Sequence, residues 1–207
     1  MLHSCRSLII SERQNSDGKL IGGPYPLDLN NDGVVQTEDT ADVYTETKDA
    51  NPDKDGWRNF AGLPHRCQQI ADIDGVRYVN DSKGTNVGAT IAALEGLGGE
   101  RNIVLIAGGQ GKGADFSQLQ PAVARHCKLV VLIGEDAPLL QRALDQHVEV
   151  ACAAGMDEAV TVAAAQALPG DCVLLSPACA SFDMFSGYTE RGDAFARAVR
   201  QIREGRS

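Results

Sequence analysis

Short apolar runs and longer amphipathic segments follow one another along most of the chain. The apolar runs carry Val and Ile and are too short for helices, so they predict β-strands. They occupy residues 75–79, 103–107, 129–133, 148–153 and 172–175. The amphipathic segments predict helices at residues 87–97, 116–126, 137–146, 156–168 and 192–203. Pro121 falls inside the second of these, so we expect that helix to begin close to it.

Alternation of strands with helices indicates right-handed βαβ units. The sequence therefore predicts an α/β protein with a mostly parallel, Rossmann-like sheet and helices on both faces. Residues 1–60 differ, because they are rich in Asp, Asn, Thr and Gly, and acidic residues outnumber basic ones there by about two to one. We expect an irregular acidic segment at 1–60 and a single domain at 61–207.

Bulk properties narrow the class of protein. The chain has 207 residues, 43% of them hydrophobic, and a formal net charge of −9, which argues against a nucleic-acid partner. No apolar run approaches the roughly 18 residues of a membrane span, and the N-terminus does not resemble a signal peptide. The six cysteines show no C-x-x-C spacing, and several lie inside apolar runs. We therefore expect reduced core cysteines in a cytoplasmic protein.

Ligands of parallel sheets bind where the strands end, so the loops that follow strands are the candidate sites. The loop at 80–86 reads Asn-Asp-Ser-Lys-Gly-Thr-Asn and opens a helix. Backbone N–H groups and the positive helix end favour an anion there. The alternative is that Asp81 and Ser82 only turn the chain and cap the helix.

A second loop, at 108–116, reads Gly-Gly-Gln-Gly-Lys-Gly-Ala-Asp-Phe. Its glycines permit close backbone approach, and Lys112 offers a flexible positive charge for a carboxylate or phosphate. It is not a P-loop, because Ile106 and Gly113 stand where that motif needs Gly and Ser or Thr. The alternative is that the glycines only shape a tight turn.

The third loop, at 176–185, reads Ser-Pro-Ala-Cys-Ala-Ser-Phe-Asp-Met-Phe. Ser181 is suited to hydrogen-bond a carboxylate, and the lack of a G-x-S-x-G motif excludes the usual serine hydrolase signature. Cys179 is expected to be buried and inert rather than nucleophilic. Taken alone, Phe182 and Phe185 are expected to lie in the core.

A fourth element, Gly-Leu-Pro-His-Arg at 62–66, precedes the predicted sheet. Adjacent His65 and Arg66 are suited to stack on a base and to hold phosphate or ribose oxygens. A surface His-Arg pair is also common without any ligand.

Along the chain the four motifs stand at 62–66, 80–86, 108–116 and 176–185, and Glu-Arg-Gly-Asp follows at 190–193. In this order they closely resemble the C-terminal domain of the Mur ligase family. Within that family they are similar to the UDP-N-acetylmuramoyl-L-alanine:D-glutamate ligases, over roughly residues 60–204. The resemblance implies ligation that depends on ATP and Mg²⁺ and adds D-glutamate to UDP-N-acetylmuramoyl-L-alanine in peptidoglycan synthesis.

The resemblance also implies roles for individual residues. It implies that the nucleotide is bound by His65, Arg66, Asp81 and Lys83. It implies that D-glutamate is bound by Thr85, Lys112, Ser181, Phe182 and the backbone near Tyr188. A dicarboxylate needs two separate anchors for its charges, and Lys112 and the Ser181 hydroxyl would supply them.

The chain departs from the family pattern in three respects. Gly84 stands where Ala is usual and Tyr188 where Phe is common. The UDP-binding and ATPase domains of the family have no counterpart, and no P-loop lies upstream of residue 60. We therefore expect the isolated chain not to carry out ligation.

The acidic segment has its own motif at residues 28–39. Asp28, Asn30, Asp32, Val34 and Asp39 occupy ligand positions of the D-x-[DN]-x-[DN]-G calcium loop. A solvated turn rich in Asp, Asn and Gly is the alternative. This motif leaves a second function open, a non-catalytic module that binds calcium, a nucleotide or an amino acid.

Overall fold

The computed structural model describes residues 13–14, 20–21 and 63–205. Residues 61–207 form one compact unit, which contains the candidate loops. In the preceding unit, the described residues form a short antiparallel pair, β1 (Arg13–Gln14) and β2 (Leu20–Ile21). None of the helices in the described part of the chain is long and apolar enough to cross a membrane.

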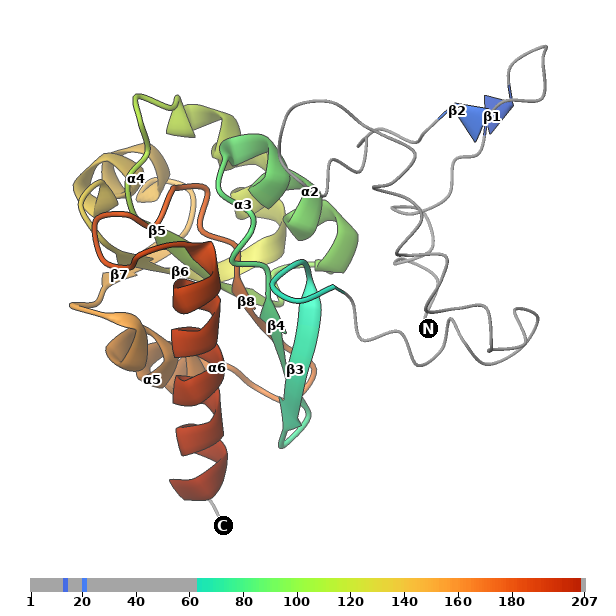
Figure 1. Ribbon diagram of the computed structural model, residues 1–207, viewed down its shortest axis with the longest axis vertical. Coiled ribbons are helices and arrows are strands. Elements are labelled where there is room, and N and C mark those ends of the chain that lie inside the picture. Colours follow the sequence, from blue (N-terminus) through green and yellow to red (C-terminus); the bar gives the residue numbers. More distant parts are fainter. Residues whose placement is uncertain (1–12, 15–19, 22–62, 206–207) are drawn as a thin grey trace. The chain divides into compact units, whose positions relative to one another are not determined.

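The compact unit is built on a six-stranded sheet with the order β3-β4-β8-β5-β6-β7 (Figure 1). Only β3 runs antiparallel to its neighbour, and the other pairs are parallel. This confirms the predicted fold class. The strands are β3 (Gln68–Ile73), β4 (Val76–Asn80), β5 (Ile103–Gly108), β6 (Cys127–Ile133), β7 (Glu149–Cys152) and β8 (Cys172–Leu175).

The helices lie in the predicted connections between strands. They are α2 (Val87–Leu97), η2 (Phe116–Leu119), α3 (Gln120–His126), α4 (Ala137–Leu144), α5 (Met156–Gln166) and α6 (Tyr188–Gly205). The predicted helix at 116–126 is divided into a 3₁₀ turn and α3. Pro121 lies in the first turn of α3, where a proline has no N–H to lose from the helix ladder.

Both faces of the sheet are covered, which explains why its central strands are apolar throughout (Figure 1). Along β5, Ile103 and Leu105 pack with the cluster formed by α2, α3 and α4. The intervening Val104 and Ile106 pack with the cluster formed by α5 and α6. The alternation of a pleated strand therefore serves two separate cores.

Strand β3 was not predicted. It joins β4 through a two-residue turn, Asp74-Gly75, in which both residues have positive φ, as a type I′ hairpin requires. This Asp-Gly pair is a recognised hairpin signal, so the sequence contained the information. A bulge at Ile70 interrupts the apolar alternation that would otherwise indicate a strand.

Helix α6 begins four residues before its predicted start. The Glu190 carboxylate accepts bonds from the Ser186 N–H and hydroxyl, both at 2.7 Å, and so secures the first turn. The predicted helix began at Gly192, but this residue lies inside α6. A Cβ at Gly192 would collide with the His65 ring, so glycine is needed for close packing there.

Candidate functional site

The three loops that follow β4, β5 and β8 are joined by backbone hydrogen bonds. The Ala178 N–H donates to the Gly84 carbonyl at 2.9 Å, and the Gly108 N–H donates to the Pro177 carbonyl at 2.9 Å. Gln110 and Ala180 form an isolated β-bridge. The structure thus brings the three candidate loops together at the carboxyl edge of the sheet, as the rule for parallel sheets predicts.

Loop 80–86 is held more firmly than a simple helix cap requires. The N-cap of α2 is Asn86, whose side-chain oxygen accepts from the Ala89 N–H at 2.9 Å. Asp81 and Ser82 therefore do not cap the helix. Ser82 is fully buried and its hydroxyl donates to the Tyr188 carbonyl at 2.7 Å.

Asp81 is a buried carboxyl group, 7% exposed. One of its oxygens accepts from the Ser176 hydroxyl at 2.7 Å, and the other from the Cys67 N–H at 3.2 Å. Burial raises the pKa of Asp81 to about 6, although these two hydrogen bonds oppose the shift. Both oxygens are thus engaged within the chain.

Arg191 connects two of the loops from α6. It is 1% exposed, and it donates from Nε to the Ser82 hydroxyl at 3.0 Å and from Nη2 to the Ser82 carbonyl at 2.9 Å. Its Nη1 donates to the Cys179 carbonyl at 3.0 Å. Burial lowers the pKa of Arg191 to about 10, which still leaves the side chain charged at neutral pH.

Sequence reasoning did not identify Arg191 as a site residue, although a signal was present. Ala194, Phe195 and Ala198 follow it at i+3, i+4 and i+7, which is the spacing of the buried face of α6. An arginine on a buried helix face needs internal partners, since burying an unpaired charge is unfavourable.

His65, Lys83 and Tyr188 form a group at the end of β4. The Lys83 N–H donates to the His65 carbonyl at 3.0 Å, and Lys83 Nζ lies 4.3 Å from the centre of the Tyr188 ring. The His65 ring meets the Tyr188 ring edge-on at 6.1 Å. Half-buried Arg66 is close enough to Asp81 to lower its pKa slightly. The residues expected on the nucleotide side therefore lie together, and Tyr188 lies with them.

Lys112 of the second loop and Phe182 of the third loop lie beside each other. Lys112 is exposed, and its Nζ lies 5.7 Å from the centre of the Phe182 ring. The expectation that Phe182 is a core residue was wrong, since it is 66% exposed. Phe185 is half-buried and packs against the core between the sheet and α5 and α6. The exposed Phe182 ring therefore offers an apolar contact surface next to the Lys112 ammonium group, which can pair with an anion.

Ser181 and Thr85 lie deeper in the loops than Lys112. Ser181 is 3% exposed, and its carbonyl accepts from the N–H groups of Met184 at 3.1 Å and Phe185 at 2.8 Å. Thr85 is half-buried and its N–H donates to the Lys83 carbonyl at 2.7 Å. Both positions are fixed by the backbone of their own loop.

The first two glycines of loop 108–116 are required by close backbone contact. Gly108 and Gly109 have φ of +119° and +124°, and an added Cβ would meet the carbonyl oxygens of Ile133 and Ala180. Close approach to the backbone of neighbouring segments therefore explains why this pair is glycine. Lys112 also has positive φ, at +52°, which directs the chain around the tip of the loop.

Two aspartates that the sequence did not single out support these loops. Asp136 accepts from the Gly111 N–H at 2.7 Å, and Asp183 accepts from the Glu135 N–H at 2.8 Å. Within the described part of the chain, the second Asp183 oxygen is buried without a hydrogen-bond partner. Asp183 lies within the motif at 176–185, whereas Asp136 lies outside the four motifs.

The five described cysteines divide into a buried and an exposed group, and no disulfide joins any two of them. Cys127, Cys172 and Cys179 are buried, and burial raises the pKa of the Cys179 thiol to about 12, so this thiol is inert as expected. Cys67 and Cys152 are exposed, contrary to the expectation of core positions.

Metal binding finds no support in residues 63–205, where no group of three or more His, Cys, Asp or Glu side chains is arranged around a common point. The predicted calcium ligands Asp28, Asn30, Asp32, Val34 and Asp39 lie outside the described residues.

Comparison with known proteins identifies relatives of this fold and these motifs. The family model described as Mur ligase, glutamate ligase domain, matches residues 65–179. The UDP-N-acetylmuramoylalanine–D-glutamate ligase of Legionella pneumophila strain Lens is 55% identical over 147 residues, covering 70% of this chain and 33% of the relative. That of Bordetella pertussis is 59% identical over 146 residues, covering 70% of this chain and 28% of the relative.

This chain therefore spans about a third of the length of these curated relatives. Among solved structures, a MurF ligase from Thermotoga maritima in complex with ADP aligns with a TM-score of 0.50 at 14% identity. The alignment covers 72% of this chain and 33% of that one, and it supports the fold alone.

Proposed function

The chain belongs to the Mur ligase family, and we propose that residues 61–207 act as the D-glutamate-binding C-terminal domain of a UDP-N-acetylmuramoylalanine–D-glutamate ligase. In this reaction ATP phosphorylates the carboxylate of UDP-N-acetylmuramoyl-L-alanine. The amine of D-glutamate then attacks the acyl phosphate, and the tetrahedral intermediate expels inorganic phosphate to leave an amide bond. This role places the protein in the cytoplasm, where the nucleotide-linked precursors of peptidoglycan are made.

D-glutamate binding is assigned to the loops after β4, β5 and β8. Lys112 would pair with one carboxylate, because its exposed ammonium group is free to reorient toward an anion. The Ser181 hydroxyl and neighbouring N–H groups would hold the second carboxylate. Phe182 would cover the aliphatic part of the amino acid, and Thr85 and the backbone at Tyr188 would complete the pocket.

Nucleotide binding is assigned to His65, Arg66, Asp81 and Lys83. The positive charges of Arg66 and Lys83 suit phosphate oxygens, and the His65 ring offers a surface for a base. Each Asp81 oxygen accepts one bond and keeps a second lone pair, but the side chain is only 7% exposed, so a ribose hydroxyl can reach it only if neighbouring groups move. We therefore expect nucleotide binding to rearrange the contacts of Asp81.

We assign phosphoryl transfer to the ATPase domain of the family, which has no counterpart in these 207 residues. The 207 residues contain no G-x-x-x-x-G-K-[ST] motif to hold the phosphates of ATP with Mg²⁺. A protein of these 207 residues is therefore expected to bind D-glutamate and not to form the amide bond. ATP-dependent product formation by such a protein would contradict this division of roles.

The observation that carries the proposal is the joining of three loops at one edge of the sheet, with Lys112 and Phe182 on their exposed side. The test is an NMR titration of the labelled 207-residue protein with D-glutamate, which detects binding in the millimolar range. L-glutamate controls for stereochemistry. Each charge-assisted hydrogen bond contributes about 1.5–3 kcal/mol, so Lys112→Met should weaken binding by about 10- to 100-fold.

Arg142→Met is the matched control, because Arg142 is an exposed cation on α4, away from the three loops. It should leave D-glutamate affinity within about twofold of the wild type. Equal affinity of the Lys112→Met variant and the wild type would exclude the proposed anchor, and so would shifts that lie outside the three loops.

A further inference from the structure

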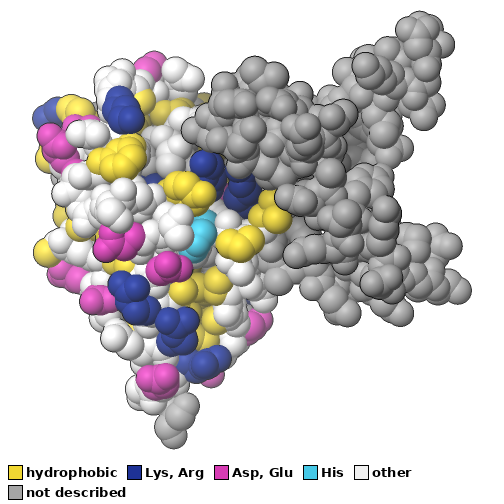
Figure 2. Space-filling model, in the orientation of Figure 1, with side chains coloured by type: hydrophobic (Ala, Val, Ile, Leu, Met, Phe, Trp, Pro, Cys, Tyr) yellow, Lys and Arg dark blue, Asp and Glu magenta, His cyan; other side chains and the backbone are white. Residues whose placement is uncertain are grey.

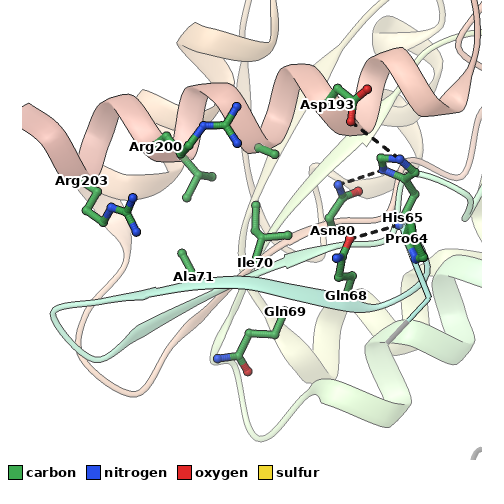
Figure 3. A pocket seen from close by; sticks show the side chains of 12 residues that line it. Pro64, His65, Gln68, Gln69, Ile70, Ala71, Asn80, Asp193, Arg200 and Arg203 are labelled. Atoms are coloured by element: carbon green, nitrogen blue, oxygen red, sulfur yellow. Dashed lines mark hydrogen bonds and ion pairs between the residues drawn. The ribbon is translucent and has the colours of Figure 1, made fainter. Parts of the chain in front are cut away.

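A cavity of about 490 Å³ lies between the edge strand β3 and helix α6 (Figure 3). It extends from His65 and Asn80 at the carboxyl end of β4 to Arg200 and Arg203 in the second half of α6. We call it the β3–α6 groove. Its volume is within the range of small-molecule sites. Lys112, Phe182 and Ser181 do not line it, so it is separate from the proposed D-glutamate pocket.

The bulge in β3 produces the floor of this groove. Regular alternation would direct Ile70 and Ala71 to opposite faces, but the extra residue lets both pack on the side of α6. In Figure 3 both side chains extend from β3 toward α6, whereas Gln69 extends the other way. Across the gap, Ala196 and Val199 give α6 a small and apolar surface. The groove therefore has an apolar floor beneath polar ends.

One end of the groove carries two positive charges. Arg200 and Arg203 lie one helical turn apart and extend from α6 at the end away from His65 (Figure 3). The C-terminal helix dipole accounts for Arg203, which lies in the last turn, but not for Arg200. Figure 2 shows Lys and Arg side chains gathered along α6 with hydrophobic side chains beside them. This concentration stands out in a chain with a net charge of −9.

The other end of the groove is neutral to acidic. His65 Nε2 lies 3.8 Å from an Asp193 oxygen, and the Asn80 amide contacts His65 Nδ1 at 3.2 Å. Ten residues of helix separate Asp193 from Arg203, a length of about 15 Å at 1.5 Å per residue. A ligand that fills the groove must therefore be elongated, with its negative charge at one end.

We propose that the β3–α6 groove binds an elongated organic anion, whose carboxylate or phosphate group pairs with Arg200 and Arg203 and whose apolar body lies along the floor. Paired guanidinium groups recognise either head group through charge-assisted hydrogen bonds. The inference is independent of D-glutamate binding, because it rests on the groove alone.

The test is an NMR titration of the full 207-residue protein with 4-phenylbutyrate and with phenyl phosphate, which carry the two head groups. Both probes should shift the amide signals of β3 and of the second half of α6. Inorganic phosphate, which has the charge without the apolar body, should bind at least tenfold more weakly than phenyl phosphate. The stronger of the two aryl probes identifies the preferred head group.

The variant Arg200→Gln with Arg203→Gln keeps most of both side-chain stems and should weaken binding of both probes at least tenfold. Arg197→Gln, an exposed arginine of the same helix outside the groove, should stay within twofold of the wild type. Ala196→Leu fills the groove without changing its charge and should also weaken binding. Unchanged affinity in the double variant, or equal losses in the Arg197 control, would overturn the proposal.

Discussion

Replacing Asp81 with asparagine should change how the stability of the protein depends on pH. The native carboxyl group keeps its proton up to a pH of about 6, because burial raises its pKa from 3.8. In the unfolded chain the group returns to its ordinary value and releases the proton earlier. The native state therefore binds more protons between these two values, and the free energy of unfolding falls as pH rises through this interval.

The size of this effect follows from the two pKa values. A shift of this extent corresponds to about 3 kcal/mol in total, and about 2 kcal/mol of it falls between pH 4 and pH 7.5. Asparagine has the same shape and no charge. It leaves one donor, from Ser176 or Cys67, facing an amide NH₂, which costs about 1 kcal/mol at every pH. That constant loss cancels when two pH values are compared.

Urea unfolding of the wild type and of Asp81→Asn at several pH values is the appropriate assay. The wild type should lose about 2 kcal/mol more than the variant between pH 4 and pH 7.5. Asp115→Asn is a control whose effect on the pH dependence has the opposite sign. Hydrogen bonds from the Ser117 side chain and N–H lower the pKa of exposed Asp115, so this carboxylate adds stability as pH rises. Parallel pH profiles for the wild type and Asp81→Asn would refute the raised pKa.

A second variant tests the Asp81–Ser176 hydrogen bond by placing a methyl group against it. A Cβ at Gly84 would lie 2.6 Å from an Asp81 oxygen and 2.6 Å from the Ser176 hydroxyl. Gly84→Ala must therefore separate these groups. The Ser176 bond holds the pKa of Asp81 down, so its loss should raise that pKa further. The free energy of unfolding should then fall more steeply between pH 4 and pH 7.5 than in the wild type. A profile like that of the wild type would show that the contact tolerates the added methyl group.

Two further predictions concern the support of the loops, and urea unfolding measures both. Arg191→Met removes three hydrogen bonds of a buried cation and deprives the carbonyls of Ser82 and Cys179 of this donor, so it should lower the free energy of unfolding by about 3 kcal/mol. Exposed Arg197→Met should change it by less than about 0.5 kcal/mol, and similar losses in both would contradict the role of Arg191. Gly109→Ala forces a Cβ against a backbone carbonyl oxygen at positive φ and should cost more than about 2 kcal/mol. Gly155→Ala, where no atom lies near the added Cβ, should cost less than about 1 kcal/mol, and a smaller loss at Gly109 than at Gly155 would contradict the packing argument.

Local pattern was sufficient for most of the fold of residues 63–205. Strand β8 and helix α2 were predicted with their observed bounds, because β8 is a continuous apolar run and α2 carries Ile91, Leu94 and Leu97 at helical spacing. Prediction was wrong or incomplete where local signals were mixed. The bulge concealed β3, and the internal Gly192 delayed the predicted start of α6.

The sequence by itself determined which loops would meet, because strands of one parallel sheet place their carboxyl ends on one edge. It also supplied the motifs that identify the family. Tertiary structure alone decided the state of individual side chains in those loops. Ser82 and Arg191 are separated by 109 residues along the chain, and Asp81 and Ser176 by 95. Burial and pairing depend on such distant neighbours, and no local pattern records them. For the same reason only the structure revealed the exposure of Phe182, the burial of Asp81 and the groove between β3 and α6.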